Sequence, residues 1–339
     1  MKKDYNYGLA LLRIILCFEV VMCHFFYEST MKSLVIFPLA KLRSFAAPTF
    51  FFLSFYLVSN KLDGANKDYI VNRIKRIIIP FTLWNIVYWI LFNVVKIIFD
   101  IGQLYGLKEL LLQVLFGHCY NPPMWFMWDM AVVTILFWMS LSLKSKYKAI
   151  GDIILFVICL GCVALQYSKI NYGMLWNLPT EIKYSIGRVA EMIPIAYIAY
   201  LCSTKLRNIF EKRSCSLIGI VGSIILVYVL REHSYIVESF GYAGIVVMLI
   251  AFLQVLFFYS LPFYILPTAV LNFIKNISQY TMGIYCLHFF VGTIINQLYM
   301  SKGIETYTIT ECILIFAICF IICFALSKTK IKYVEMMIK

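Results

Sequence analysis

Charged residues are scarce in this chain. Asp, Glu, Lys and Arg make up 14% of its 339 residues, whereas about 25% is usual in soluble domains. Apolar residues make up 62%. This balance excludes an ordinary soluble enzyme, a disordered chain and a secreted disulfide scaffold. About ten apolar runs of roughly 20 residues are each long enough to cross a bilayer, so we predict an all-α, polytopic membrane helix bundle.

The sequence also lacks the short motifs of common soluble enzymes. It has no P-loop, no dinucleotide-binding glycine pattern and no G-x-S-x-G. The soluble acyltransferase signature, a histidine followed four residues later by aspartate, is absent because His24 is followed by Glu28. Most of the 11 cysteines lie inside apolar runs, and Cys159 and Cys162 form a lone C-x-x-C. We therefore expect no metal site and no redox motif.

The apolar runs predict ten transmembrane spans. The predicted spans are 8–27, 44–60, 77–99, 124–143, 150–168, 184–203, 215–231, 243–265, 277–299 and 308–327. The stretch 108–117 is too short to cross, so it is expected to be an interfacial or re-entrant helix. The first run lacks an A-x-A site and carries Arg13, Glu19 and His24, so it is predicted to remain as a span and not to be a cleaved signal peptide.

The net charge of +13 is explained by topology. In a soluble protein it would suggest nucleic acid, but basic residues gather in the cytoplasmic loops of membrane proteins, and no nucleic-acid partner is expected. With the N-terminus inside, Lys and Arg favour the inside loops by more than two to one. This bias predicts cytoplasmic termini and an even number of spans. Residues 1–339 are expected to form a single membrane domain with no appended soluble domain.

Charged side chains within the first span are the first clue to function, because each costs roughly 2.5–3.5 kcal/mol at the bilayer centre. Arg13 and His24 are eleven residues apart, which on a helix is about 16 Å and nearly the same face. Glu19 lies between them, and Glu28 follows His24 by four residues, close enough to orient the imidazole. The simpler alternative is a snorkelling arginine and an interfacial histidine.

A second basic cluster, Arg73 and Arg76, precedes the third predicted span. Side chains three residues apart share a helix face, and two guanidinium groups there would form a phosphate-binding surface on the cytoplasmic side. The alternative is an ordinary positive-inside anchor.

Further ionisable residues lie in later spans. They are Lys96, Asp129, Arg188, Glu191, His288 and Glu311. Trp125 and Asp129 open the fourth span, where the tryptophan also fits an interfacial aromatic belt. Arg188 and Glu191 are three residues apart, so an intrahelical ion pair is the simple alternative. Lys96 lies near a span end and is expected to snorkel.

Four motifs together give the chain a family resemblance. The first is Arg13 and His24, separated by ten residues. The others are Phe51-Phe52-Leu53-Ser54, the R-x-x-R of Arg73 and Arg76, and Ile277-Ser278 through Tyr285-Cys286-Leu287-His288. In this order and placement they resemble the acyltransferase-3 family of membrane-bound O-acyltransferases, whose members decorate bacterial surface polysaccharides. The chain departs from the family pattern at Phe55, where a glycine is usual, and at Gln279, which separates Ser278 from Tyr280.

The resemblance implies an O-acyltransferase of the bacterial cell membrane. The donor would be cytoplasmic acyl-CoA, most often acetyl-CoA, used as a substrate and not as a bound cofactor. The acceptor would be a hydroxyl of a surface polysaccharide or its lipid-linked precursor. His24 would act as general base or as transient acyl carrier, and Glu19 or Glu28 would orient it. The arginines expected to bind acyl-CoA are Arg13, Arg73 and Arg76; the residues expected to line the acceptor cavity are Trp125, Asp129, Arg188, Tyr285 and His288.

One alternative function stays open from the sequence. A transporter, flippase or exporter of polysaccharide intermediates also needs many helices and buried charges. It would favour internal repeats or helices broken by glycine and proline. With 16 Gly and 9 Pro, mostly outside the span centres, this signal is thin.

Overall fold

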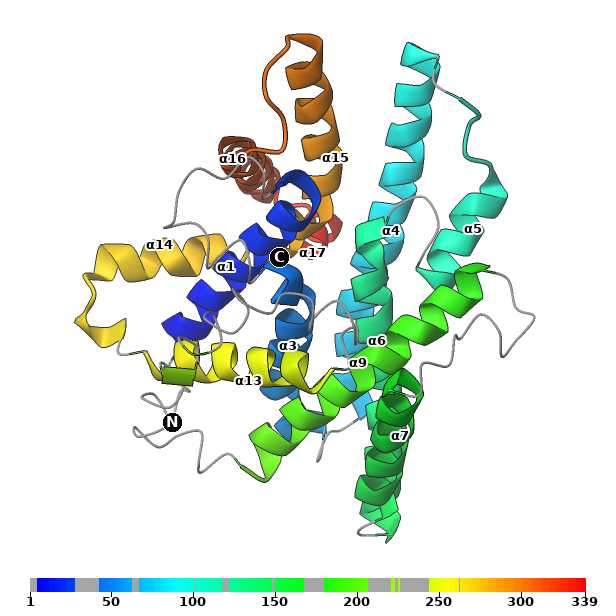
Figure 1. Cartoon of the computed structure of the whole chain (residues 1–339), viewed down its shortest axis with the longest axis vertical. Helices are drawn as coiled ribbons and strands as arrows, with labels where there is room; N and C mark the ends of the chain where they lie inside the picture. The colour runs from blue at the N-terminus through cyan, green and yellow to red at the C-terminus, as the bar shows by residue number, and fades with distance from the viewer. Residues whose placement is uncertain are drawn as a thin grey trace. The chain divides into compact units, whose positions relative to one another are not determined.

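The regular secondary structure of the computed structural model is helical in the part of the chain that it describes (Figure 1). It describes residues 5–27, 43–62, 67–100, 102–117, 122–147, 150–167, 180–206, 221–222, 225, 244–261 and 263–339. No strand occurs within these ranges. The chain divides into two compact units: unit 1 comprises 1–53, 205–239 and 246–339, and unit 2 comprises 54–204 and 240–245.

Unit 1 is built around the first and last long helices. Its elements are α1 (Tyr7–Phe25), η2 (Arg43–Phe45), the first part of α3 (Ala46–Leu62), α13 (Ile245–Ser260), η4 (Phe263–Ile265), α14 (Thr268–Ser278), α15 (Thr281–Ser301), α16 (Ile309–Ser327) and α17 (Lys332–Ile338). Helices α15 and α16 form an antiparallel hairpin, and α1 packs against α14, α15 and α16 (Figure 1). The two ends of the chain therefore contribute to one helical layer.

Helix α1 begins and packs for simple local reasons. Asn6 caps it, because its side-chain oxygen accepts a hydrogen bond of 2.9 Å from the backbone N–H of Leu9. Gly8 allows a close approach, since a Cβ there would overlap the backbone oxygen of Phe258 in α13. Near its other end, a Cβ on Gly292 of α15 would lie 2.3 Å from the ring of Phe25. These two glycines let α1 lie directly against its neighbours.

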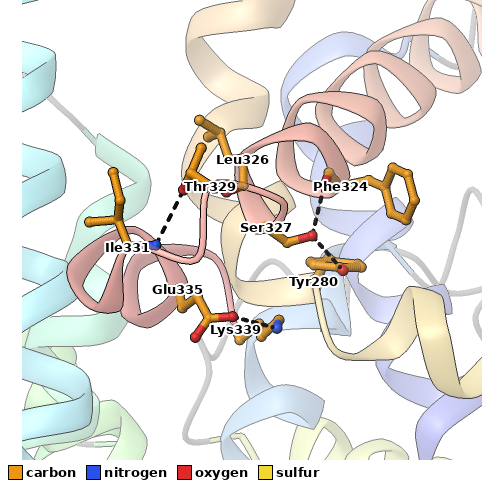
Figure 2. Close-up of polar contacts among 8 residues, drawn as sticks. All are labelled: Tyr280, Phe324, Leu326, Ser327, Thr329, Ile331, Glu335 and Lys339. Atoms are coloured by element: carbon orange, nitrogen blue, oxygen red, sulfur yellow. Dashed lines mark hydrogen bonds and ion pairs between the residues drawn. The ribbon is translucent and has the colours of Figure 1, made fainter.

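The C-terminal helix α17 folds back beneath α15. Figure 2 shows Ser327 at the end of α16, where its Oγ donates to the Phe324 carbonyl (2.7 Å) and accepts from the Tyr280 hydroxyl (3.0 Å). Ile338 is fully buried, and a Cβ on Gly283 of α15 would lie 2.9 Å from the Ile338 Cα. Glycine is therefore required for α17 to pack against α15 in this way.

Unit 2 contains the middle helices of the chain. Its elements are the second part of α3, α4 (Lys67–Phe99), α5 (Leu107–Phe116), η3 (Pro122–Met124), α6 (Trp125–Tyr147), α7 (Ile150–Tyr167) and α9 (Thr180–Thr204). Helix α6 packs against α4, α7 and α9.

The short helix α5 is tied back to the end of α4. Asn93 forms two hydrogen bonds with the backbone of Tyr105, of 3.0 and 2.8 Å. Lys96 donates to the Gln103 carbonyl (2.6 Å) and lies over the ring of Tyr105. Lys96 is thus bound at a helix end, as the prediction of a snorkelling lysine requires.

Six helices of the described ranges are long and apolar enough to cross a membrane: α1, α4, α6, α9, α15 and α16. Helices α7 and α13 contain shorter apolar segments. The membrane helix bundle is thereby supported, whereas ten spans and cytoplasmic termini stay predictions. The predicted span 215–231 lies almost entirely outside the described residues. The expected short helix at 108–117 is present as α5.

The predicted start of the third span is wrong as a helix boundary. Helix α4 begins at Lys67, ten residues before the predicted start at 77. No glycine or proline interrupts its first three turns, and Asp68 favours the N-terminal end of the helix dipole. Arg73 and Arg76 therefore lie within α4 and not before it.

Candidate active site

A pair of histidines lies side by side in unit 1. His24 is in the last turn of α1 and His288 is in the middle of α15. Their ring centres are 5.3 Å apart, with 39° between the ring planes. The ring of Phe289 also packs against His24, and the two ring centres are 5.6 Å apart. The close packing of Phe25 on Gly292 explains why the two helices approach here.

The two histidines differ in exposure and bonding. His288 is 0% exposed, whereas His24 is partly exposed. The Nδ1 of His288 lies 2.5 Å from the carbonyl oxygen of Tyr285, one turn earlier. A carbonyl only accepts hydrogen bonds, so this contact assigns the proton of His288 to Nδ1 and leaves Nε2 as an acceptor. That Nε2 is buried and has no hydrogen-bond partner.

Glu19, one of the two carboxylates expected to orient His24, does not bond to it in the structure. Glu19 is 1% exposed, but it forms no hydrogen bond or ion pair with His24, and its Oε2 has no partner. Five residues along a helix place two side chains on different faces, which explains the separation. Glu28 lies outside the described residues. Arg13 is partly buried, three turns before His24 on the same helix.

Unit 2 holds a half-buried arginine that no carboxylate neutralises. The Nη2 of Arg73 donates to the Ser54 hydroxyl at 3.0 Å and lies 3.8 Å from the sulfur of Met130. Its guanidinium is 6.0 Å from the ring centre of Phe55, and its Nε is buried without a partner. No ion pair to Arg73 occurs in the part of the chain that the structure describes. A guanidinium held in this way is suited to bind an anion.

Arg73 also explains part of the F-F-L-S motif. Ser54 is the hydroxyl that holds the guanidinium, a role that the sequence analysis did not assign. A polar serine inside an apolar run was the available signal. Arg76, by contrast, is exposed. Arg73 and Arg76 therefore differ in exposure, and a joint phosphate-binding surface of the two stays a prediction.

The start of α6 carries a second unpartnered charge. Asp129 is 1% exposed, and neither carboxylate oxygen has a hydrogen-bond partner. The charges of Arg188 and Glu191 on α9 interact electrostatically with its carboxylate. Within the described ranges, however, Arg188 forms no ion pair with Asp129. The guanidinium of Arg188 instead lies over the ring of Trp125, 4.2 Å from its centre. These residues of unit 2 form a polar group with unused hydrogen-bonding capacity.

Glu311 is a structural residue. It is 0% exposed and accepts hydrogen bonds from the backbone N–H of Tyr307 (2.5 Å) and from the Asn296 amide (3.3 Å). Thr308 caps the same helix end by accepting from the Glu311 N–H. Within the described ranges, no group of three or more His, Cys, Asp or Glu residues is placed to hold a metal ion.

A comparison with known protein families assigns the chain to one of them. A family model described as an acyltransferase domain, that of the acyltransferase-3 family, matches residues 6–328, nearly the whole chain. The match includes the histidine pair, Arg73 and Asp129. No curated protein and no solved structure matches the chain. By this match, the chain belongs to the acyltransferase-3 family and is a membrane acyltransferase.

Proposed function

We propose that this protein transfers an acetyl or other short acyl group from cytoplasmic acyl-CoA to a hydroxyl of a cell-surface polysaccharide or its lipid-linked precursor. The observation that carries the proposal is the contact between His24 and His288. A partly exposed imidazole beside a second, fully buried one is a site for proton transfer. It lies in a chain whose family transfers acyl groups.

The donor would be bound through its phosphates. Arg73 supports this role, because its guanidinium is held by Ser54 and carries no neutralising carboxylate. Arg76 is exposed on the same helix, where a mobile cation suits the outer phosphates of CoA. Arg13, partly buried on α1, is the third cation we assign to the donor.

The chemistry needs one base and a site that excludes water. His24 removes the proton of the acceptor hydroxyl while its oxygen attacks the thioester carbonyl. A C–O bond forms, the C–S bond breaks, and the departing thiolate of CoA takes the proton from His24. If His24 is instead the transient acyl carrier, its ring nitrogen makes the first attack and the hydroxyl the second. Burial among apolar helices protects the thioester from hydrolysis in both cases.

The acceptor would use the polar group at the start of α6. A sugar hydroxyl can donate to the free oxygens of Asp129 and accept from Arg188 in the same contact. Trp125 adds an aromatic surface of the kind on which sugar rings pack. Tyr285, three residues before His288 on α15, is a further residue that we assign to acceptor binding. We place the protein in the bacterial cell membrane, where such an acceptor is found.

The donor hypothesis is tested by ligand-dependent stability. Detergent-purified protein is heated with and without acetyl-CoA, alongside Arg73→Ala and His24→Ala. A ligand that binds only the folded state at a hundredfold excess over its Kd adds about 2.7 kcal/mol. We expect a clear rise in Tm for the native protein and for His24→Ala, and a much smaller one for Arg73→Ala. If acetyl-CoA, CoA and succinyl-CoA all leave Tm unchanged at millimolar concentration, the donor hypothesis fails and transport of polysaccharide intermediates becomes the better explanation.

The product is tested in cells. Envelope polysaccharide from cells expressing the native chain or His24→Ala is treated with mild alkali, which releases O-acetyl groups as acetate. We expect ester-linked acetate to depend on the native chain. Equal amounts of released acetate in both strains would contradict the proposed acceptor class.

A further inference from the structure

The unpartnered nitrogen of His288 is the feature that the proposed reaction leaves without a task. A buried polar atom without a hydrogen bond is costly, and such atoms are uncommon in folded proteins. Here the atom is Nε2 of a ring that is 0% exposed, and the other nitrogen of that ring is held by the Tyr285 carbonyl. The ring of His288 packs beside that of His24, so this nitrogen would act through its neighbour.

His24 is the neighbour within reach. The two ring centres are 5.3 Å apart. Ring nitrogens lie close to 1 Å from the centre of an imidazole, so nitrogens that face each other would be separated by about 3 Å, a hydrogen-bond distance. The rings are tilted by 39° and not bonded in the structure, so a small rotation of the partly exposed His24 is sufficient.

We propose that His288 is the positioning residue of His24: its Nε2 accepts the ring N–H of His24 and fixes which nitrogen of His24 is left free to take a proton. The inference rests on the proposed function and deepens it. It gives His288 the orienting task that the sequence analysis assigned to Glu19 or Glu28.

The arrangement forms a chain of donors and acceptors with a single direction. The Tyr285 carbonyl accepts from Nδ1 of His288, and Nε2 of His288 accepts from one nitrogen of His24. The second nitrogen of His24 is then unprotonated and faces the acceptor hydroxyl. When His24 takes the hydroxyl proton, the hydrogen bond to His288 stabilises the imidazolium until the CoA thiolate receives that proton. A neutral imidazole is a suitable hydrogen-bond acceptor in a membrane interior, because a carboxylate in its place would need to be desolvated.

The experiment uses two substitutions of His288 and a matched control. His288→Gln keeps an oxygen able to accept from His24, whereas His288→Leu removes the acceptor but fills the space. Asn296→Leu is the control, since Asn296 is also buried on α15 and also donates a hydrogen bond, but lies eight residues further along the helix. Each protein is reconstituted in lipid nanodiscs, and CoA release from acetyl-CoA is measured with glycerol or with hydroxylamine as the nucleophile.

The two nucleophiles separate positioning from general damage. Glycerol needs a base to remove its hydroxyl proton, whereas hydroxylamine attacks a thioester without one. We expect His288→Leu to lower the glycerol rate by about 10- to 100-fold, the usual cost of losing an orienting partner, and the hydroxylamine rate by less than about threefold. His288→Gln is expected to stay within about fivefold of the native protein with both nucleophiles, and Asn296→Leu to change both rates by the same factor.

Three results would lead to different conclusions. If His288→Leu lowers both rates equally, His288 is merely structural and the inference is overturned. The same conclusion follows if His288→Gln is as inactive as His288→Leu, since an accepting atom alone would then be insufficient. If the native protein releases no more CoA than a protein-free control with either nucleophile, the proposed function itself fails.

Discussion

Helices α16 and α6 each bury a carboxylate near their N-terminal ends, but the hydrogen bonding of the two carboxylates differs. Glu311 is 0% exposed and accepts hydrogen bonds from the Tyr307 backbone and the Asn296 side chain. Asp129 is 1% exposed, and both of its oxygens lack a partner. Burial alone therefore does not distinguish the two carboxylates; the completeness of their hydrogen bonds does.

The same distinction applies to the other buried polar groups. Tyr200 donates to Asp152 at 2.7 Å and Thr49 donates to Gln254 at 2.7 Å, so both pairs tie neighbouring helices together. Among the groups with an unused atom are Glu19, Arg73, Asp129 and His288. Three of these, Arg73, Asp129 and His288, belong to the proposed donor, acceptor and catalytic sites. Four substitutions test the comparison between buried groups that have all their hydrogen bonds and those that do not.

The largest effect is expected for Glu311→Ala. It removes a carboxylate and leaves the Asn296 amide and the Tyr307 N–H without an acceptor in a buried turn. We expect a loss of about 3 kcal/mol in the free energy of unfolding, with unchanged acyl transfer per folded molecule. Thermal unfolding in detergent and CoA release, measured on the same preparation, check both parts. A large loss of specific activity at unchanged Tm would make Glu311 functional and would break the comparison.

A smaller effect, on ligand binding, is expected for Arg73→Ala. The loss of a guanidinium that pairs with a phosphate costs about 2 kcal/mol, which corresponds to roughly 30-fold in the Kd of acetyl-CoA. Arg73→Lys keeps the charge but loses the fork that donates to Ser54, so an intermediate Kd is expected. Isothermal titration of the two variants provides the test. Equal Kd values for native protein and Arg73→Ala would place the donor elsewhere.

The third substitution, Asp129→Asn, is expected to raise stability slightly and to lower activity. A neutral amide of the same shape costs less to bury than an unpaired carboxylate, so we expect a gain of about 1 kcal/mol in unfolding free energy. Incorporation of acetyl groups into the polysaccharide should fall, while the acetyl-CoA-dependent rise in Tm should persist. A drop in Tm like that of Glu311→Ala would mean that Asp129 is bonded in the working protein.

The smallest effect is expected for Arg76→Ala. An exposed cation contributes little, so the Kd of acetyl-CoA should change by about two- to threefold, or less than 1 kcal/mol. The change should shrink further at high salt, because exposed charges are screened. Titrations at two ionic strengths measure it. A loss as large as that of Arg73→Ala, insensitive to salt, would show that Arg76 turns inward when the donor binds.

Most helices were predictable from hydropathy, and the exceptions have a physical cause. Helices α1, α6, α15 and α16 lie within a few residues of their predicted spans, because an apolar run long enough to cross a bilayer has few other structures open to it. Hydropathy is blind to polar helical turns, so it placed the start of α4 too late. The amphipathic helix α14 was missed for the same reason.

The candidate site was only partly predictable. Ionisable residues in apolar runs drew attention to His24, Asp129 and His288, because such residues are expensive to insert. The pairing of His24 with His288 joins residues 264 positions apart, and no local pattern encodes it. The different exposure of Arg73 and Arg76 was also not predictable, because spacing on a helix gives a shared face but not how deeply each side chain is buried. Hydrogen bonding at Ser54 settles that depth for Arg73.

The packing of Ile338 against Gly283 has a practical consequence for anyone expressing this protein. Helix α17 is seven residues long, and its Ile338 is fully buried. A purification tag or fluorescent reporter joined directly there would pull on a contact that lies five residues before His288 on α15. Attachment through a long Gly/Ser linker, or at the other end of the chain, would leave the histidine pair undisturbed.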